Sequence, residues 1–278
     1  MPEVPKAEVP KTPKKKMEEA TKWTIGGVLS GLVAEALLLG YMWYLEANAN
    51  KETAIVYTAK VLPESFNPPF SLMDFGTRIN AKADISTLGV LHLTAPYSYI
   101  SDSIIYKMSP PYPNIPNGLT GFTAIMKCKY QNGGPLSPTL IISDGIKGHP
   151  SFGIDALDRV NRLHLFSGDV SAMNGSQEYF YDVDSSNYFR VRLTLQWDGD
   201  KVWRGKFWLN DELKFNGELH PPTDLQMMTD NQLIFGLFGG TGPIAPTGTD
   251  AWIEYLIFDG AGAFSPEEKS DSHYLQGK

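Results

Sequence analysis

Acidic and imidazole side chains are the natural candidates for catalysis in this chain. Asp182 and Asp184 alternate on one face of an expected strand, but a Ser-Ser-Asn turn follows them, which favours a solvated strand end. The five histidines show no paired spacing for a metal ion or for a Ser-His-Asp arrangement. They are His92, His149, His164, His220 and His273. We therefore expect a protein that is not an enzyme.

Three tryptophans, Trp197, Trp203 and Trp208, lie close together in the sequence. Their flat indole rings are candidates for stacking on a sugar, and the alternative is that they belong to the core of a β-sheet protein. The single cysteine, Cys128, excludes an intramolecular disulfide and a cysteine-rich zinc site. Because it lies in an apolar run, we expect a buried thiol.

Composition and charge narrow the class of protein. The chain has 278 residues, of which 42% are hydrophobic, so it has enough apolar material for a packed core. Its 24 Lys and Arg residues against 31 Asp and Glu residues give a net charge of −7. A protein that neutralises phosphates needs the opposite balance, so we expect no nucleic-acid partner.

Short runs with a two-residue period dominate the chain after residue 53, and Gly, Pro, Asn and Asp turns separate them. The expected strands are 54–62, 89–94, 121–130, 139–143, 162–166, 178–183, 188–196, 201–209, 232–238 and 251–258. No helical pattern of useful length and no fixed repeat interrupts them. This pattern predicts an all-β fold, an antiparallel sandwich or barrel.

Residues 188–216 form an alternating strand, an Asp-Gly turn, an aromatic strand and a short third strand. This segment resembles the concanavalin A-like lectin/glucanase superfamily, particularly its laminin G-like branch. The runs 121–126, 232–236 and 252–258 are similar to other strands of that fold. The resemblance covers 54–259 and implies an antiparallel jelly-roll sandwich.

The resemblance also bears on ligands. Retaining glucanases of the superfamily carry a Glu-x-Asp-x-x-Glu run, which this sequence lacks, so their catalytic pair is not implied here. Laminin G-like domains often hold Ca²⁺, and Asp144, Asp169 and Asp250 are the candidate ligands in expected loops. The chain departs from the family at Asp211, where a glycine usually follows asparagine. Calcium and a glycan are thus possible ligands.

Residues 23–45 contain one formal charge, and as a helix they are roughly 34 Å long at about 1.5 Å per residue. That length spans a bilayer core, so we expect a transmembrane helix over 23–47. Aromatic residues at its two ends fit the membrane interfaces, and lysines precede it, which places the N-terminus in the cytoplasm. These aromatic residues are Trp23, Tyr41, Trp43 and Tyr44. A cleaved signal peptide ending near Ala47-Asn48-Ala49 is the alternative.

Glu35 lies in the middle of this apolar span, where a carboxyl group is costly unless it meets a partner. Gly27, Gly31 and Glu35 recur every fourth residue, so they share one face of the expected helix. This face favours contact with other transmembrane subunits. The alternative is a lone anchor whose carboxyl group is protonated or reaches toward the interface.

The chain therefore divides into a Pro/Lys-rich cytoplasmic tail (1–22), a transmembrane helix (23–47), an extracytoplasmic β-sandwich (48–259) and a C-terminal tail (260–278). The favoured function is a non-catalytic assembly subunit of a membrane or surface complex, with the sandwich in the periplasm, outside the cell or on a virion envelope. Alternatives are a membrane-tethered glycan-binding module, with or without Ca²⁺, and a diverged glycoside hydrolase.

Overall fold

A computed structural model describes eleven stretches of the chain. They are 54–73, 81–95, 103–108, 121–131, 136–143, 150–155, 162–169, 177–198, 203–219, 232–239 and 248–278. The expected transmembrane span, with Gly27, Gly31, Glu35 and its interfacial aromatic residues, lies outside these stretches. Among the described residues, no helix has the length and apolarity needed to cross a bilayer. Thr53–Lys278 forms one compact unit.

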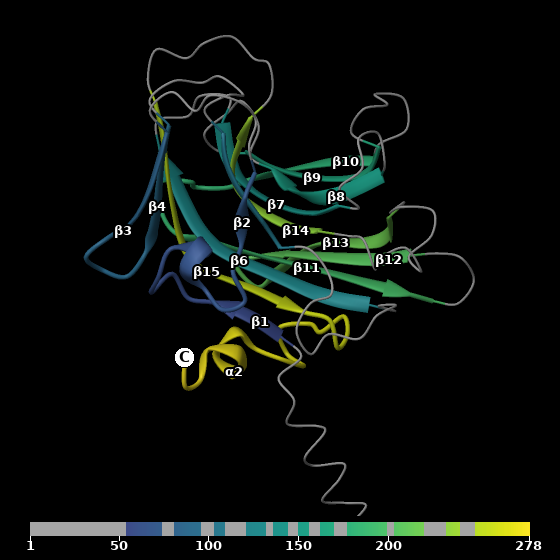
Figure 1. Ribbon diagram of the computed structural model, residues 1–278. Helices are drawn as coiled ribbons and strands as arrows, with labels where there is room; N and C mark the ends of the chain where they lie inside the picture. Colours follow the sequence, from purple (N-terminus) through teal and green to yellow (C-terminus); the bar gives the residue numbers. More distant parts are fainter. Residues whose placement is uncertain are drawn as a thin grey trace, which may run out of the picture. The chain divides into compact units, whose positions relative to one another are not determined.

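The fold is all-β, with two antiparallel sheets facing each other (Figure 1), as the alternating pattern predicts. Sheet A has the order β13-β12-β11-β6-β15-β4-β3, and β1 also pairs with β15. Its strands are β1 (Ala54–Tyr57), β3 (Lys82–Ile85), β4 (Leu91–Ala95), β6 (Gly121–Gln131), β11 (Phe189–Trp197), β12 (Trp203–Leu209), β13 (Glu212–Leu219) and β15 (Thr249–Asp259).

Sheet B has the order β10-β9-β8-β7-β14-β5-β2. Its strands are β2 (Ser71–Leu72), β5 (Ile104–Met108), β7 (Leu136–Ser143), β8 (Pro150–Asp155), β9 (Arg162–Asp169), β10 (Gln177–Asp182) and β14 (Gln232–Gly239). Two short helices complete the described structure, η1 (Pro63–Ser65) and α2 (Asp271–Leu275). Each of the ten expected strands overlaps one of these strands, although the expected strand 54–62 ends in the structure at Tyr57.

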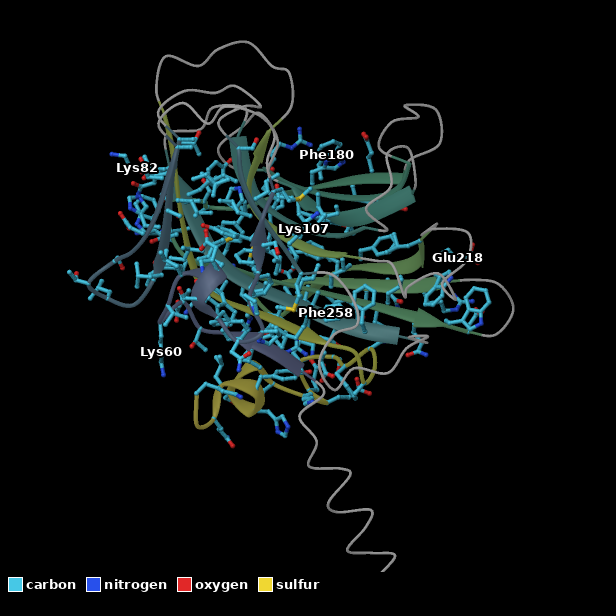
Figure 2. The ribbon with its side chains drawn as sticks, in the orientation of Figure 1. Lys60, Lys82, Lys107, Phe180, Glu218 and Phe258 are labelled. Atoms are coloured by element: carbon cyan, nitrogen blue, oxygen red, sulfur yellow. The ribbon has the colours of Figure 1, made fainter. Side chains whose placement is uncertain are left out.

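Alternation along each strand sends one set of side chains between the sheets. On β11, for example, Val191, Leu193 and Leu195 are fully buried in the main core. Phe258 of β15 belongs to the same core, and Figure 2 shows how side chains fill the space between the sheets. Removing such a side chain from water contributes about 1.5–3 kcal/mol, so this inner layer holds the sandwich together.

A β-bulge interrupts the alternation in β15 between Ile253 and Tyr255. Before the bulge, Ala251 and Ile253 face the core, whereas after it Leu256 and Phe258 do. The bulge residue reverses the parity of the strand, because side chains alternate with a period of two. The odd-numbered positions of β15 therefore face the main core before the bulge, and after it they face the outer side of sheet A.

The C-terminal segment after Asp259 runs along the face of sheet A that points away from sheet B (Figure 1). Tyr274 of α2 packs there against Val56, Ile125 and Ile257 in a small second core. A reciprocal pair of bonds starts a turn before α2, since Ser265 N–H donates to Glu268 and Glu268 N–H donates to the Ser265 hydroxyl. The expected tail thus covers part of the sheet.

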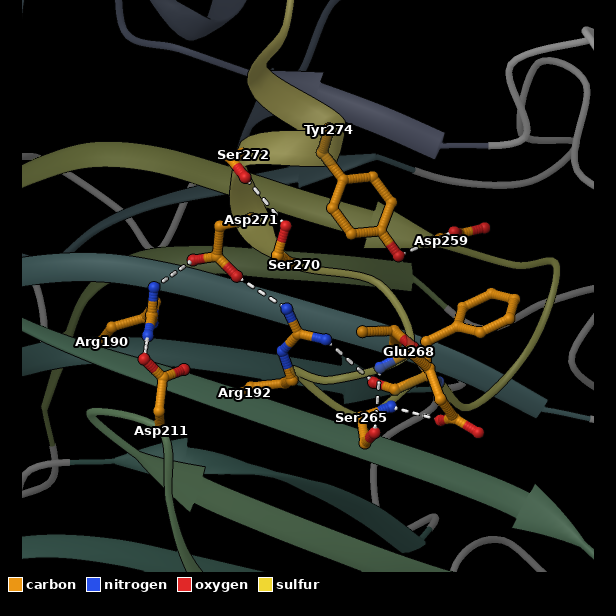
Figure 3. Close-up of polar contacts among 12 residues, drawn as sticks. Arg190, Arg192, Asp211, Asp259, Ser265, Glu268, Ser270, Asp271, Ser272 and Tyr274 are labelled. Carbon is orange, nitrogen blue, oxygen red and sulfur yellow. Dashed lines mark hydrogen bonds and ion pairs between the residues drawn. The ribbon is translucent and has the colours of Figure 1, made fainter.

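Charged groups fix this segment (Figure 3). Asp271, only 6% exposed, accepts bonds from Arg192 Nη2 at 2.7 Å and Arg190 Nη1 at 3.1 Å. The Tyr255 hydroxyl also donates to Asp271. Arg192 is 2% exposed, and its Nη1 donates to the Phe264 carbonyl at 3.0 Å. Such a buried ion pair is costly to form but far more costly to break on one side.

Asp259, at the end of β15, is fully buried and accepts three bonds. They come from Lys269 Nζ at 2.7 Å, the Tyr274 hydroxyl at 2.8 Å and the Ala261 N–H at 2.9 Å. Burial alone raises the pKa of this carboxyl group, but these donors outweigh it and hold the pKa below its usual value. Asp259 is therefore ionised in the folded protein.

Asp271→Ala should lower the free energy of unfolding by about 3–5 kcal/mol, because it leaves the buried Arg192 guanidinium without its counter-ion. Ser272→Ala, on the exposed side of the same helix, is the matched control and should change it by about 0.5 kcal/mol or less. Urea unfolding of both variants measures the difference. Equal, small losses in the two variants would contradict the role given to Asp271.

Acid should weaken the fold partly through Asp259. Since its folded pKa lies below the unfolded value of about 3.9, its stabilisation is present above that value and is lost as the pH falls through the folded pKa. Urea unfolding of Asp259→Asn between pH 7 and pH 3 should show a shallower acid decline than the unsubstituted chain. Glu218→Gln, at an exposed position of β13, should keep the full decline. Identical curves for Asp259→Asn and the unsubstituted chain would refute this assignment.

Candidate binding face

The three candidate tryptophans do not form one stacking platform, and Trp197 and Trp203 follow the alternative that they belong to the core. Trp203 and Trp208 are only 6% and 5% exposed, and they face opposite sides of β12 because an odd number of positions separates them. Trp197 lies opposite Trp203 in the register, and their ring centroids are 4.9 Å apart. This pair packs against the main core, while Trp208 lies on the outer side, opposite Arg192.

The candidate calcium ligands are distributed over the two sheets. Asp144 lies outside the described residues, and Asp169 ends β9 of sheet B. Asp250 lies in β15 of sheet A, where its carboxylate contacts His92 and Thr94. Among the described residues, no group of three or more His, Cys, Asp or Glu side chains is suited to hold a metal ion. Calcium binding therefore stays a prediction.

The outer face of sheet A has a second half that the described C-terminal segment does not cover. We call it the open face, and the strand registers arrange it in rows. Asp84, His92, Trp252 and Lys129 form one row across β3, β4, β15 and β6, and Tyr188, just before β11, contacts the end of it. Lys82, Thr94, Asp250 and Gln131 form the neighbouring row. Figure 2 labels Lys82 at the β3 edge.

Trp252 is the centre of the open face. The His92 imidazole stacks on one side of its indole ring, with centroids 4.8 Å apart and planes 5° from parallel. The Lys129 ammonium lies on the indole ring as well, 4.6 Å from its centroid. Stacking and cation–π contacts each add about 0.5–1 kcal/mol at such half-buried sites. The row is thus held in place before any ligand arrives.

One end of the row is cationic and aromatic. Lys129 Nζ lies 5.1 Å from the Tyr188 ring centroid, and Lys127 Nζ lies 5.7 Å from it. Lys127 also pairs with Glu254, the bulge residue of β15, at 2.7 Å. Burial, and then the Glu254 carboxylate, raise the pKa of Tyr188. The phenol therefore remains a neutral hydrogen-bond donor at physiological pH.

The other end is rich in acceptors. His92 Nε2 lies 2.9 Å from Asp250 Oδ1, and His92 Nδ1 lies 3.5 Å from Asp84 Oδ1. The Thr94 hydroxyl donates to Asp250 at 3.1 Å and also lies 3.2 Å from His92 Nε2. Because the Thr94 hydroxyl donates its hydrogen bond to the Asp250 carboxylate, His92 is not placed as a base toward Thr94. This end suits the binding of hydroxyl groups.

Sequence reasoning did not single out His92, Lys129, Tyr188 or Trp252 as site residues. A signal was present, since His92 and Thr94 alternate with buried residues of β4, and Lys127 and Lys129 do so on β6. The order β3-β4-β15-β6 was not visible, because these strands are far apart in the chain. Asp250 was identified, but as a loop ligand for calcium.

No protein-family model matches the chain, and no curated protein matches it by sequence. Among solved structures, the chain is similar to the botulinum neurotoxin type C described in work on cell entry through two ganglioside molecules, with 13% identity and a TM-score of 0.52. That match covers 83% of this chain and 51% of the other. The alginate lyase Aly36B is similar with 10% identity and a TM-score of 0.51, covering 76% and 98%.

These matches support the all-β sandwich fold. At 13% and 10% identity, these matches are evidence for the fold and not for a shared function. The chain spans about half the length of the neurotoxin chains that it matches.

Proposed function

We propose that this chain is a non-catalytic binding module and that its open face holds a glycan. The observation that carries the proposal is the row from Asp84 to Tyr188, in which a carboxylate, an imidazole, an indole, an ammonium and a phenol follow one another across adjacent strands. A glycan offers many hydroxyl groups and apolar ring faces. The open face supplies hydrogen-bond acceptors and donors for the hydroxyl groups, and aromatic rings for the apolar ring faces.

The size of the open face fits a chain of sugars better than a single one. Neighbouring strands lie about 4.8 Å apart, so the row from β3 to the position of Tyr188 spans roughly 19 Å. The His92–Asp250–Thr94 contacts and the ring contacts of Trp252 fix most of its side chains. Such preorganisation lowers the entropy lost on binding.

The fold is compatible with this proposal. The similar neurotoxin is described as interacting with gangliosides, and the similar lyase is named for alginate, so glycan ligands occur on sandwiches of this kind.

We also propose the concanavalin A-like, laminin G-like assignment on the motifs of residues 188–216. Calcium dependence through Asp144, Asp169 or Asp250 is tested by measuring binding with and without a chelator.

Trp252→Ala should weaken glycan binding by about five- to thirtyfold, since the loss of a central aromatic contact costs about 1–2 kcal/mol. Phe180→Ala is the matched control, because Phe180 is an aromatic residue 42% exposed on sheet B, away from the open face. A glycan array followed by calorimetry with both variants makes the comparison. Equal affinities for the two variants would place the ligand elsewhere.

A second candidate function is assembly with other membrane subunits. The sequence supports it through Glu35, which shares a helical face with Gly27 and Gly31 in an apolar span. In this function the sandwich is held at the outer surface of a membrane by a single span. The two functions are compatible, because the span and the open face belong to different parts of the chain.

Glu35→Leu should reduce recovery of co-purifying membrane proteins, because it removes the polar contact that favours helix association. Val33→Leu, on the opposite side of the expected helix, should leave recovery unchanged. Quantitative mass spectrometry of the gently extracted full chain reports both. Unchanged recovery of these membrane proteins with Glu35→Leu would indicate that the expected helix is only a membrane anchor.

A further inference from the structure

Lys129 differs from its neighbour Lys127 in its charge environment. Lys127 has Glu254 as a counter-ion at 2.7 Å. Within the part of the chain that the structure describes, no carboxylate lies within ion-pair distance of Lys129 Nζ, which instead contacts the rings of Trp252 and Tyr188. Lys129 as a whole residue is half-buried. A cation without a counter-ion in such surroundings attracts an anion more strongly than one in open water.

The charges around Lys129 limit which anion fits. Asp250 and Glu254 lie on the same open face and are negative, so a group with two or more charges meets repulsion there. The described residues of the two rows include no arginine, the side chain whose fork favours bidentate phosphate binding. A single carboxylate group matches one ammonium and tolerates these neighbours. The acceptors Asp84 and Asp250 remain for hydroxyl groups of the same ligand.

We propose that the ligand of the open face is an acidic oligosaccharide whose carboxylate pairs with Lys129. This inference rests on the proposed glycan function and specifies its ligand class. The uronate carboxylate lies at the Lys129–Tyr188 end, while neighbouring sugar hydroxyls donate to Asp250 and Asp84. The tyrosine phenol supplies a second donor to the carboxylate.

The test compares an oligouronate with the same oligosaccharide after reduction of its carboxyl groups, both titrated into the full chain. The unsubstituted chain should bind the acidic form about tenfold or more tightly, as expected for a hydrogen bond to a charged group. Lys129→Gln should weaken binding of the acidic form about tenfold more than binding of the reduced form, and so remove this preference. Lys127→Gln is the matched control, because Lys127 lies beside the same tyrosine but has its own counter-ion, and it should keep the preference.

The outcomes separate the inference from the proposed function. Equal affinity for both oligosaccharides in the unsubstituted chain would overturn the acidic ligand and leave glycan binding intact. Binding of neither form, nor of any neutral glycan on an array, would overturn both. Equal loss of preference in the two lysine variants would overturn the assignment to Lys129 and indicate a diffuse positive patch. Lys129→Arg should retain the preference, which checks that any loss comes from charge and not from misfolding.

Discussion

The β-bulge between Ile253 and Tyr255 determines what the outer face of sheet A can carry. Without it, a strand that buries Ala251 and Ile253 would also bury Tyr255 and Ile257 between the sheets. With it, Trp252 points outward before the bulge and Tyr255 points outward after it, while Leu256 and Phe258 remain in the main core. The bulge residue, Glu254, provides the counter-ion of Lys127. One irregular residue in β15 therefore links the core, the open face and the contact surface of the C-terminal segment.

The C-terminal segment divides that outer face into two halves with different chemistry. Over the half beyond the bulge, Asp271 pairs with both Arg190 and Arg192, and Asp211 supplies a second negative charge to Arg190. Tyr274 packs on Ile125 and Ile257 in the same half. Removing water from these charges is tolerable only because each finds a partner, so the segment and the sheet depend on each other. The half before the bulge keeps its row of aromatic and charged side chains in contact with solvent. The covered half fixes the segment, and the open half is free for a ligand.

The strand pattern was predictable because burial on one face produces a two-residue period, and the all-β antiparallel sandwich followed from it. Two of the missed strands carry a weak signal: β3 alternates polar and apolar residues but is only four residues long, and β8 begins with proline and contains glycine. The bulge gives no local signal, so the outward direction of Trp252 was not predicted. Core packing, one of the two alternatives for the tryptophan cluster, is found for Trp197 and Trp203. Asp271 looked like part of a polar tail, since its partners Arg190 and Arg192 lie about eighty residues earlier in the chain.

The central claim is that a glycan contacts the open face, and the indole N–H of Trp252 reports on it directly. The chain has six tryptophans, so ¹⁵N-tryptophan labelling gives a small set of indole signals, and Trp252→Phe assigns the relevant one. On titration with an oligouronate, we expect the Trp252 signal to shift while those of Trp197 and Trp203 stay in place. A ligand that binds but shifts the Trp197 or Trp203 signal instead would place the site at the tryptophan pair and contradict this account.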